Sequence, residues 1–207
     1  MSVIPLIFTS SWASGINAYA VVLLLGLFGR FDNVSSVPPG LERTDVLVIA
    51  AVLCLFEVVA DKIPYVDSAW DAVHTVIRPV AGAVVAALLA GHAHDSLATL
   101  AAAAMGGTTA LVSHLVKSGI RMGVNTSPEP FSNILVSLFE EFSVASLVIL
   151  ALFHPLPAAI IAGVLLLTGV LVVGFTLSRI RRYWIRRRER RQQRALPRQD
   201  VAARSGG

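Results

Sequence analysis

Six apolar runs of roughly membrane-spanning length follow one another along this chain of 207 residues, and they constrain its fold more than any other feature. A bilayer core about 30 Å thick needs about 20 apolar residues per helix. The runs cover roughly 8–30, 45–61, 76–92, 97–121, 132–153 and 157–179. Only 14% of the residues are charged, against about 25% in an ordinary soluble domain. The sequence therefore predicts an all-α integral membrane protein with about six transmembrane helices.

The charges are distributed unevenly between a membrane domain, residues 1–180, and a basic tail, residues 181–207. From Arg179 onward the chain holds eleven Lys and Arg against two acids, whereas the preceding part holds six against eleven. Because Lys and Arg concentrate on the cytoplasmic side of membrane proteins, the tail is expected in the cytoplasm. Six crossings would place the N-terminus there as well.

The basic tail is expected to continue the last helix and then to end in a disordered segment. Its charge predicts attraction to anionic membrane lipids, worth about 1 kcal/mol per basic residue near the surface. No base-reading module accompanies the arginines, so nucleic acid is not an expected partner.

Short similarities between the two halves of the chain raise the question of a duplication. Leu55-Phe-Glu57 recurs as Leu138-Phe-Glu140, and the segments 79–91 and 157–169 share five identities in thirteen positions. Apolar helices match by chance easily, so both a coincidence and a true repeat stay open. A true repeat would consist of halves 8–92 and 97–179 in opposite orientations, a plan common among transporters.

The connection between the second and third runs predicts a short interfacial helix. Asp67, Asp71, His74 and Arg78 recur at spacings of four, three and four, which is one face of a helix. Trp70 on the neighbouring face would anchor it at the membrane surface, with the polar face in water. The alternative is that Asp67, Asp71 and His74 hold a metal ion.

Ionisable side chains inside the apolar runs predict a polar interior. Glu57 and Asp61 share one face of the second run, and His114, Lys117 and Arg121 share one face of the fourth. These groups either form an ion-pair lock between helices or line a polar cleft. The long side chains of Lys117 and Arg121 could instead extend to lipid headgroups.

Glu140 and Glu141 lie near the middle of the fifth run. Adjacent helical residues point about 100° apart, so both carboxylates cannot face one neighbouring helix. One could pair with Lys117 or His114, and the other could face a cavity or hold a proton as part of a relay.

Two stretches of backbone are expected to be irregular at membrane depth. Pro128 and Pro130 prevent a continuous helix between the fourth and fifth runs, where polar groups either contact a ligand or, at Ser132 and Asn133, cap the fifth helix. In the first run, small and polar residues allow either close helix packing or a broken helix. The candidate contact residues are Gly15, Asn17, Asn125, Ser127, Glu129 and Asn133.

No catalytic pattern occurs in the chain. It has one cysteine, Cys54, and it lacks a Ser-His-Asp order, an HExxH motif, a phosphate-binding loop and a CxxC motif. Neither enzymatic activity nor a cofactor is predicted.

Several motifs together resemble those of the DUF4126 family of small bacterial membrane proteins, over residues 10–155. They are Ser14-Gly-Ile-Asn-Ala-Tyr19, Phe56-Glu-Val-Val-Ala-Asp-Lys-Ile-Pro64, Asp67-Ser-Ala-Trp-Asp-Ala-Val-His74, Arg78-Pro79 and Asn125-Thr-Ser-Pro-Glu-Pro-Phe-Ser-Asn133. The resemblance implies a multi-pass protein of the bacterial inner membrane. It implies no established activity and no catalytic residues.

We expect a small membrane transporter or channel that is cation- or proton-linked, because the membrane domain is acidic. Six short spans enclose little volume, which favours a homo-oligomer. The alternatives are a non-transporting scaffold and a protein that binds or flips lipid, so the expected ligand is a small ion or a lipid. The expected polar cleft is lined by Glu57, Asp61, Glu140, Glu141, Lys117, Arg121 and His114.

Overall fold

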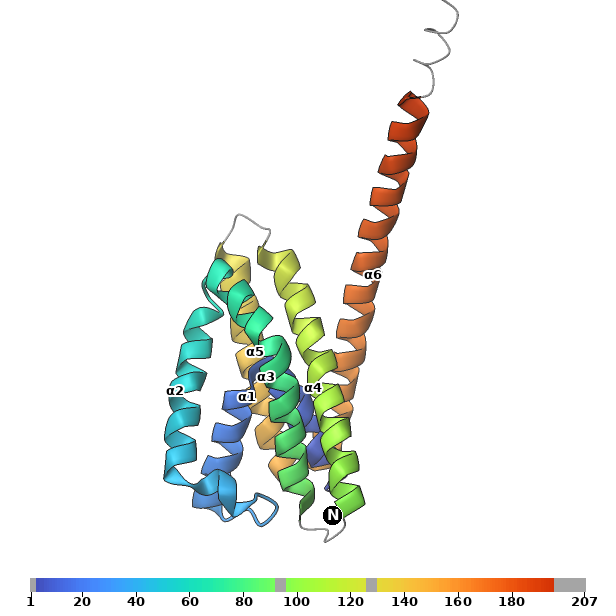
Figure 1. The fold of residues 1–207 in the computed structure, drawn as a ribbon. Coiled ribbons are helices and arrows are strands. Elements are labelled where there is room, and N and C mark those ends of the chain that lie inside the picture. The colour runs from blue at the N-terminus through green and yellow to red at the C-terminus, as the bar shows by residue number, and fades with distance from the viewer. Residues whose placement is uncertain (1–2, 92–95, 126–129, 196–207) are drawn as a thin grey trace, which may run out of the picture. The chain divides into compact units, whose positions relative to one another are not determined.

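The computed structural model of the chain describes residues 3–91, 96–125 and 130–195, and these ranges contain helices and connecting turns but no strand. The all-α class is therefore confirmed. The elements are α1 (Ile4–Asp32), the 3-10 turn η1 (Pro39–Glu42), α2 (Thr44–Ala60), α3 (Pro64–Ala90), α4 (Ser96–Asn125), α5 (Pro130–Phe153) and α6 (Pro155–Ala195), as Figure 1 shows.

Five helices, α1, α3, α4, α5 and α6, are long and apolar enough to cross a membrane. α2 has 17 residues, about 25 Å of helix, which falls short of a hydrocarbon core about 30 Å thick. Large apolar side chains such as Phe139, Leu167 and Phe175 are exposed, as expected where lipid covers the surface. The chain is a multi-pass membrane protein, although the predicted number of six spans is not confirmed.

α1 is broken at Asn17, whose backbone (φ −148°, ψ 96°) leaves the helical region. The side-chain Oδ1 of Asn17 accepts a hydrogen bond of 2.8 Å from the backbone N–H of Ala20, which is the geometry of a helix N-cap. Asn17 thus ends the N-terminal half of α1 (4–16) and starts the C-terminal half (18–32). The broken-helix reading of this segment is confirmed.

The two halves of α1 run in opposite directions. The N-terminal half runs alongside α4, since Ser113 and Lys117 donate to the carbonyls of Trp12 and Ile16, respectively. The C-terminal half begins beside α3, where the hydroxyl of Tyr19 lies 3.0 Å from Nε2 of His74.

α3 and α4 are antiparallel neighbours, so α1 turns back on itself at Asn17. Thr75 on α3 lies 3.1 Å from His114 on α4, and further along Gly82 packs on Gly106. In Figure 1 the N-terminus and the connection 33–43 consequently lie at the same end of the helix bundle. We call this the loop end, and the opposite end, which holds residues 61–63, the turn end.

Close packing fixes the position of this break. A Cβ on Gly15 would collide with the backbone carbonyl oxygen of Ala110 and with the side chain of Ser113. Small residues at such crossings let helix backbones approach closely in membranes. The close-packing role proposed for Gly15 is therefore confirmed alongside the break.

The prediction of a separate interfacial helix after residue 61 is wrong. These residues form the first turns of α3, which continues without interruption to Ala90. The polar face of Asp67, Asp71, His74 and Arg78 is buried, with exposed fractions of 6% or less. It is buried because the polar face of α4 lies opposite it, which makes burial less costly than the sequence pattern alone suggests.

The chain divides into two compact units, residues 1–169 and 170–207. The second unit contains the later part of α6, which carries the exposed side chains of Arg181, Arg182 and Arg186 and continues to Ala195. The predicted helical extension of the last run is thus confirmed. The predicted disordered end, residues 196–207, lies outside the described residues.

Candidate functional site

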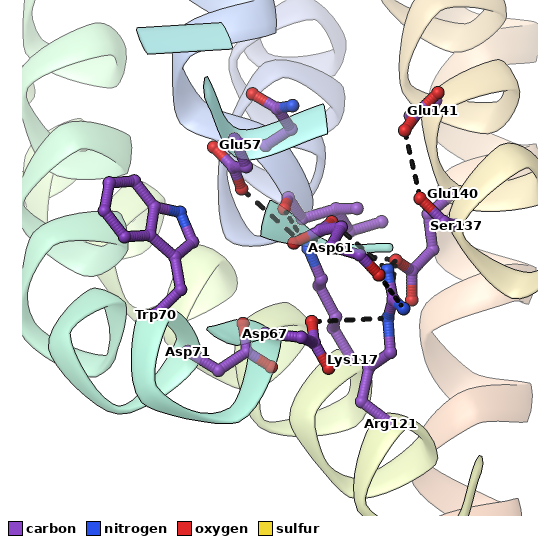
Figure 2. A network of polar contacts seen from close by, with 12 residues as sticks. Glu57, Asp61, Asp67, Trp70, Asp71, Lys117, Arg121, Ser137, Glu140 and Glu141 are labelled. Atoms are coloured by element: carbon purple, nitrogen blue, oxygen red, sulfur yellow. Dashed lines mark hydrogen bonds and ion pairs between the residues drawn. The ribbon is translucent and has the colours of Figure 1, made fainter. Parts of the chain in front are cut away.

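The candidate site is a buried ion network beside the break in α1, with side chains from α2, α3, α4 and α5 and from the turn that follows α2. Figure 2 shows most of its members converging between these elements. The network consists of five carboxyl groups and three cations, namely Glu57, Asp61, Asp67, Asp71 and Glu140 with Arg78, Lys117 and Arg121.

Arg78 on α3 is fully buried and joins three helices. Its Nη2 donates to Oε1 of Glu57 at 2.5 Å, and its Nη1 donates to Oδ1 of Asp71 at 3.0 Å. Nη1 also lies 2.7 Å from Nδ1 of His114 and 3.5 Å from the carbonyl oxygen of Gly15. Because a guanidinium can only donate, Nδ1 of His114 is an acceptor, and this imidazole is neutral.

Lys117 on α4 lies at the centre of three carboxylates. Its Nζ is 2.6 Å from Oδ2 of Asp61 and 3.8 Å from both Oε1 of Glu57 and Oε2 of Glu140. It also donates to the carbonyl oxygen of Ile16 at 3.2 Å. A single ammonium therefore links α1, α2, the turn after α2, and α5.

Arg121, one turn further along α4, clamps the turn that follows α2. It donates to the backbone carbonyl of Asp61 at 2.8 Å and to Oδ1 of Asn133 at 2.6 Å. It also pairs with the side chain of Asp61 at 3.2 Å and with Glu140 at 2.9 Å, while Asp67 lies 3.8 Å away. This cation joins the turn after α2 to α3 and α5.

The cations also stabilise the broken end of α1. The last carbonyls of a helix have no partner within the helix and carry the negative end of its dipole. Just before the break, the carbonyl oxygen of Gly15 accepts a hydrogen bond from Arg78, and that of Ile16 accepts one from Lys117. The carbonyl oxygen of Trp12 accepts a hydrogen bond from the hydroxyl of Ser113. The break is therefore satisfied by the same groups that hold the carboxylates.

The network holds more acid than base. If all five carboxyl groups were ionised, two negative charges would remain unbalanced in a buried region, which is strongly unfavourable. Oε2 of Glu57 and Oδ1 of Asp61 are buried without a hydrogen-bond partner among the described residues. The excess of acid would be relieved by a proton or another cation bound at the network.

Two cavities reach the network from different sides. The polar cavity, about 230 Å³, lies between α3 and α4 and is lined by Asp67, Asp71, Ser118 and Arg121 among others. The lateral cavity, about 320 Å³, lies between α1, α4, α5 and the start of α6, and Lys117 and Glu140 belong to its lining.

Most of the predicted cleft residues are brought together. Glu57, Asp61, Glu140, Lys117 and Arg121 form one cluster, and His114 adjoins it through Arg78. Lys117 and Arg121 are 3% and 1% exposed, so the alternative in which they extend to lipid headgroups is wrong.

Glu141 lies apart from this cluster. Its carboxylate pairs with Lys62 at 2.8 Å and accepts from Ser137, and both charged side chains are partly exposed. Figure 2 shows Glu141 away from the central group, joined by a dashed line to Ser137.

Of the four contact residues predicted near the end of α4 and the start of α5, the structure describes Asn125 and Asn133. Asn133 contacts Arg121 and the carbonyl of Asp61, and therefore belongs to the network rather than to a helix cap. Asn125 donates to Asp67. Ser127 and Glu129 lie outside the described residues.

The alternative of a metal site at Asp67, Asp71 and His74 finds no support in the described residues. Among the described residues no group of three His, Cys, Asp or Glu side chains is arranged to hold a metal ion. Asp71 pairs with Arg78, Asp67 accepts from Asn125, and Nδ1 of His74 lies 2.8 Å from the carbonyl of Trp70.

Arg78 is the network residue that the sequence analysis does not include in the cleft, because the spacing of Asp67, Asp71, His74 and Arg78 assigns it to a solvated helix face. The signal was present in its spacing: Asp71 and Arg78 are seven residues apart on one helix face. The face of His114, Lys117 and Arg121 on α4 has a comparable spacing. The two polar faces could therefore have been expected to pack against each other.

Comparison with known proteins gives the family. Neither the search of curated proteins nor the search of solved structures produced a match. A family model described as a domain of unknown function (DUF4126) matches residues 4–174, most of the chain and all of the ion network. The chain belongs to the DUF4126 family.

Proposed function

We propose that this protein is a small membrane transporter or channel whose ion network carries protons across the bilayer. The observation that supports the proposal most strongly is the excess of two carboxyl groups over cations in the buried network. A buried carboxyl without a balancing cation takes up a proton or another cation. Intramembrane acids in such surroundings are typical of proton relays.

The broken helix supports the same proposal. Transporters place substrate and ion sites beside discontinuous helices near the membrane midplane, and irregular backbone at that depth is tolerated where protein or a wet cavity covers it. In this chain the break at Asn17 is covered by Arg78 and Lys117. The polar cavity lies against Asp67, Asp71 and Arg121 and would give protons access to the network, and the lateral cavity approaches it from another side.

A test of this proposal is proton flux in liposomes that contain the full chain and trapped pyranine. An inside-negative potential set by potassium and valinomycin should acidify these vesicles faster than protein-free vesicles. Glu140→Gln should lower the flux toward the protein-free rate. The matched control is Glu141→Gln, which should leave flux unchanged because Glu141 pairs with Lys62 outside the network.

If wild-type vesicles acidify no faster than empty vesicles, the proposal of proton transport is wrong. The ion network is then a structural lock between helices, and the scaffold alternative takes its place. Size-exclusion profiles of both glutamine variants show whether a loss of flux reflects a loss of fold.

The direction of the chain in the membrane follows from α1. We infer that α1 enters and leaves on one side and that α2, although short for a span, crosses between the loop end and the turn end as α3 to α6 do. The chain then makes five crossings, and the two termini lie on opposite sides. The arginines after residue 179 favour a cytoplasmic C-terminus and hence an external N-terminus. The prediction of a cytoplasmic N-terminus depended on six full crossings, whereas both ends of α1 lie at the loop end.

Labelling with a membrane-impermeant maleimide tests this topology. In a Cys54→Ser background, Ser2→Cys should react in intact cells of a bacterial host, whereas Ser205→Cys should react only after permeabilisation. Reaction of both positions only after permeabilisation would contradict the re-entrant arrangement of α1 and support six crossings.

The inverted repeat remains a prediction, and one distance favours it. Lys117 lies 3.8 Å from Glu57 and 3.8 Å from Glu140, the two glutamates that the repeat would make equivalent. α1 and α4, which the repeat would make equivalent, differ in conformation. α1 is broken at Asn17, whereas α4 is one helix.

A further inference from the structure

The lateral cavity has the construction of a site for an amphipathic small molecule. Its volume of about 320 Å³ lies within the usual range for ligand sites, about 300–1,000 Å³. Its walls are largely apolar and include Trp12, Ile16, Phe139, Leu165 and Leu166. The charged residues of its lining are Lys117 and Glu140, which also belong to the ion network.

The two charged groups differ in how fully they are engaged. Lys117 already contacts Asp61, with Nζ and Oδ2 2.6 Å apart, and donates to the carbonyl of Ile16. The contacts of Glu140 with Arg121 and Lys117 all involve Oε2, so Oε1 has no partner among the described residues. Glu140 therefore has a carboxylate oxygen available for a further contact, whereas the ammonium of Lys117 is already engaged.

Two observations favour a cation over an anion in this site, and a third concerns the body of the ligand. The adjoining network holds two more carboxyl groups than cations, so an anion would meet a net negative charge. Trp12 and Phe139 add aromatic surface, and aromatic faces attract ammonium-type cations. Apolar walls favour a ligand with a hydrophobic body.

We propose that the lateral cavity binds a hydrophobic organic cation, with Glu140 as its counter-ion. This inference deepens the proposed function, on which it rests, by naming a substrate class that would share the network with protons. Binding itself can be measured without transport, so the two proposals fail separately.

The probe is tetraphenylphosphonium, and tetraphenylborate is a control of closely similar shape and opposite charge. Equilibrium binding is measured with the full wild-type chain in nanodiscs, after subtraction of binding to empty nanodiscs. Tetraphenylphosphonium should bind saturably, and tetraphenylborate should show no saturable component. Glu140→Gln should weaken the phosphonium Kd about 10- to 100-fold, the usual effect of removing a charged partner.

Two further variants separate a direct contact from a general loss of fold. Leu166→Trp fills the lateral cavity without touching the ion pairs and should abolish saturable binding. Glu141→Gln removes a carboxylate one residue away, outside the cavity lining, and should bind like wild type. Thermal unfolding of each variant verifies that the protein is folded.

The proposal is overturned if both probes bind equally, because binding is then simple partition into an apolar space. It is also overturned if tetraphenylborate binds more tightly, which would make Lys117 the contact, or if folded Leu166→Trp binds like wild type. Saturable, Glu140-dependent phosphonium binding without proton flux would support this inference while contradicting the proposed function.

Discussion

The Arg78→Gln variant is expected to lose about 3–5 kcal/mol of its free energy of unfolding, the usual cost of removing one partner from a buried ion pair. Arg78 is fully buried and donates to Glu57 and Asp71. Its removal leaves Asp71 without its ion-pair partner and Glu57 with Lys117 alone, 3.8 Å away, in a network that already has fewer cations than carboxyl groups. Glutamine can replace one hydrogen bond but not the charge.

Denaturant or thermal unfolding of the full chain in detergent measures this loss. The matched control is Arg43→Gln, because Arg43 pairs with Asp45 at 2.7 Å on the exposed surface, where such pairs are worth about 0–1 kcal/mol. Adding Glu57→Gln to Arg78→Gln should recover part of the stability, since it removes one stranded charge. An Arg78→Gln variant as stable as Arg43→Gln would show that water screens the ion pairs of Arg78, and would contradict their burial.

Lys117→Gln should produce a loss of similar size, about 3–5 kcal/mol. Its ammonium lies within 4 Å of three of the network's carboxylates, Glu57, Asp61 and Glu140. It also satisfies the carbonyl of Ile16 at the break, so the variant should loosen α1 as well.

The double variant Lys117→Gln with Asp61→Asn identifies the cause. It restores the charge balance of the wild type, so it should unfold at a free energy closer to wild type than Lys117→Gln alone. Additive losses in the double variant would show that packing, and not charge, explains the effect. Hydrogen exchange of the 12–20 segment reports on the break itself.

The sequence predicted much of the fold because membrane helices leave a strong signal. The apolar runs located α4, α5 and the start of α6 to within a few residues, since each needs enough apolar residues to cross the bilayer. The acids and bases inside those runs were also recognised, because charge at membrane depth is costly and therefore conspicuous.

The pairing of helix faces could not be predicted from the sequence. Asp67, Asp71 and His74 have the spacing of any polar helix face, and this spacing is the same for a face in water and a face against another helix. Their burial depends on α4, which brings Ser118 and Arg121 against them. A one-dimensional pattern holds no record of which helix lies opposite.

The turn in α1 was suggested but not specified by its sequence. Ser14, Gly15 and Asn17 allow a break, but they also suit an unbroken helix with small residues at a crossing. The break forms here because Arg78, Ser113 and Lys117 are in place to satisfy the carbonyls it frees. These partners lie 63 to 101 positions away in the chain.

The central claim is that the network's surplus carboxyl groups hold protons that exchange with water. Infrared spectroscopy of the full chain at neutral pH tests it most directly through the C=O stretch of protonated carboxyl groups. We predict such a band in the wild type, shifted in D₂O. It should persist in Glu141→Gln and vanish in Glu57→Gln/Glu140→Gln, where three network carboxyls face three cations. A wild-type spectrum without the band at neutral pH would contradict the claim.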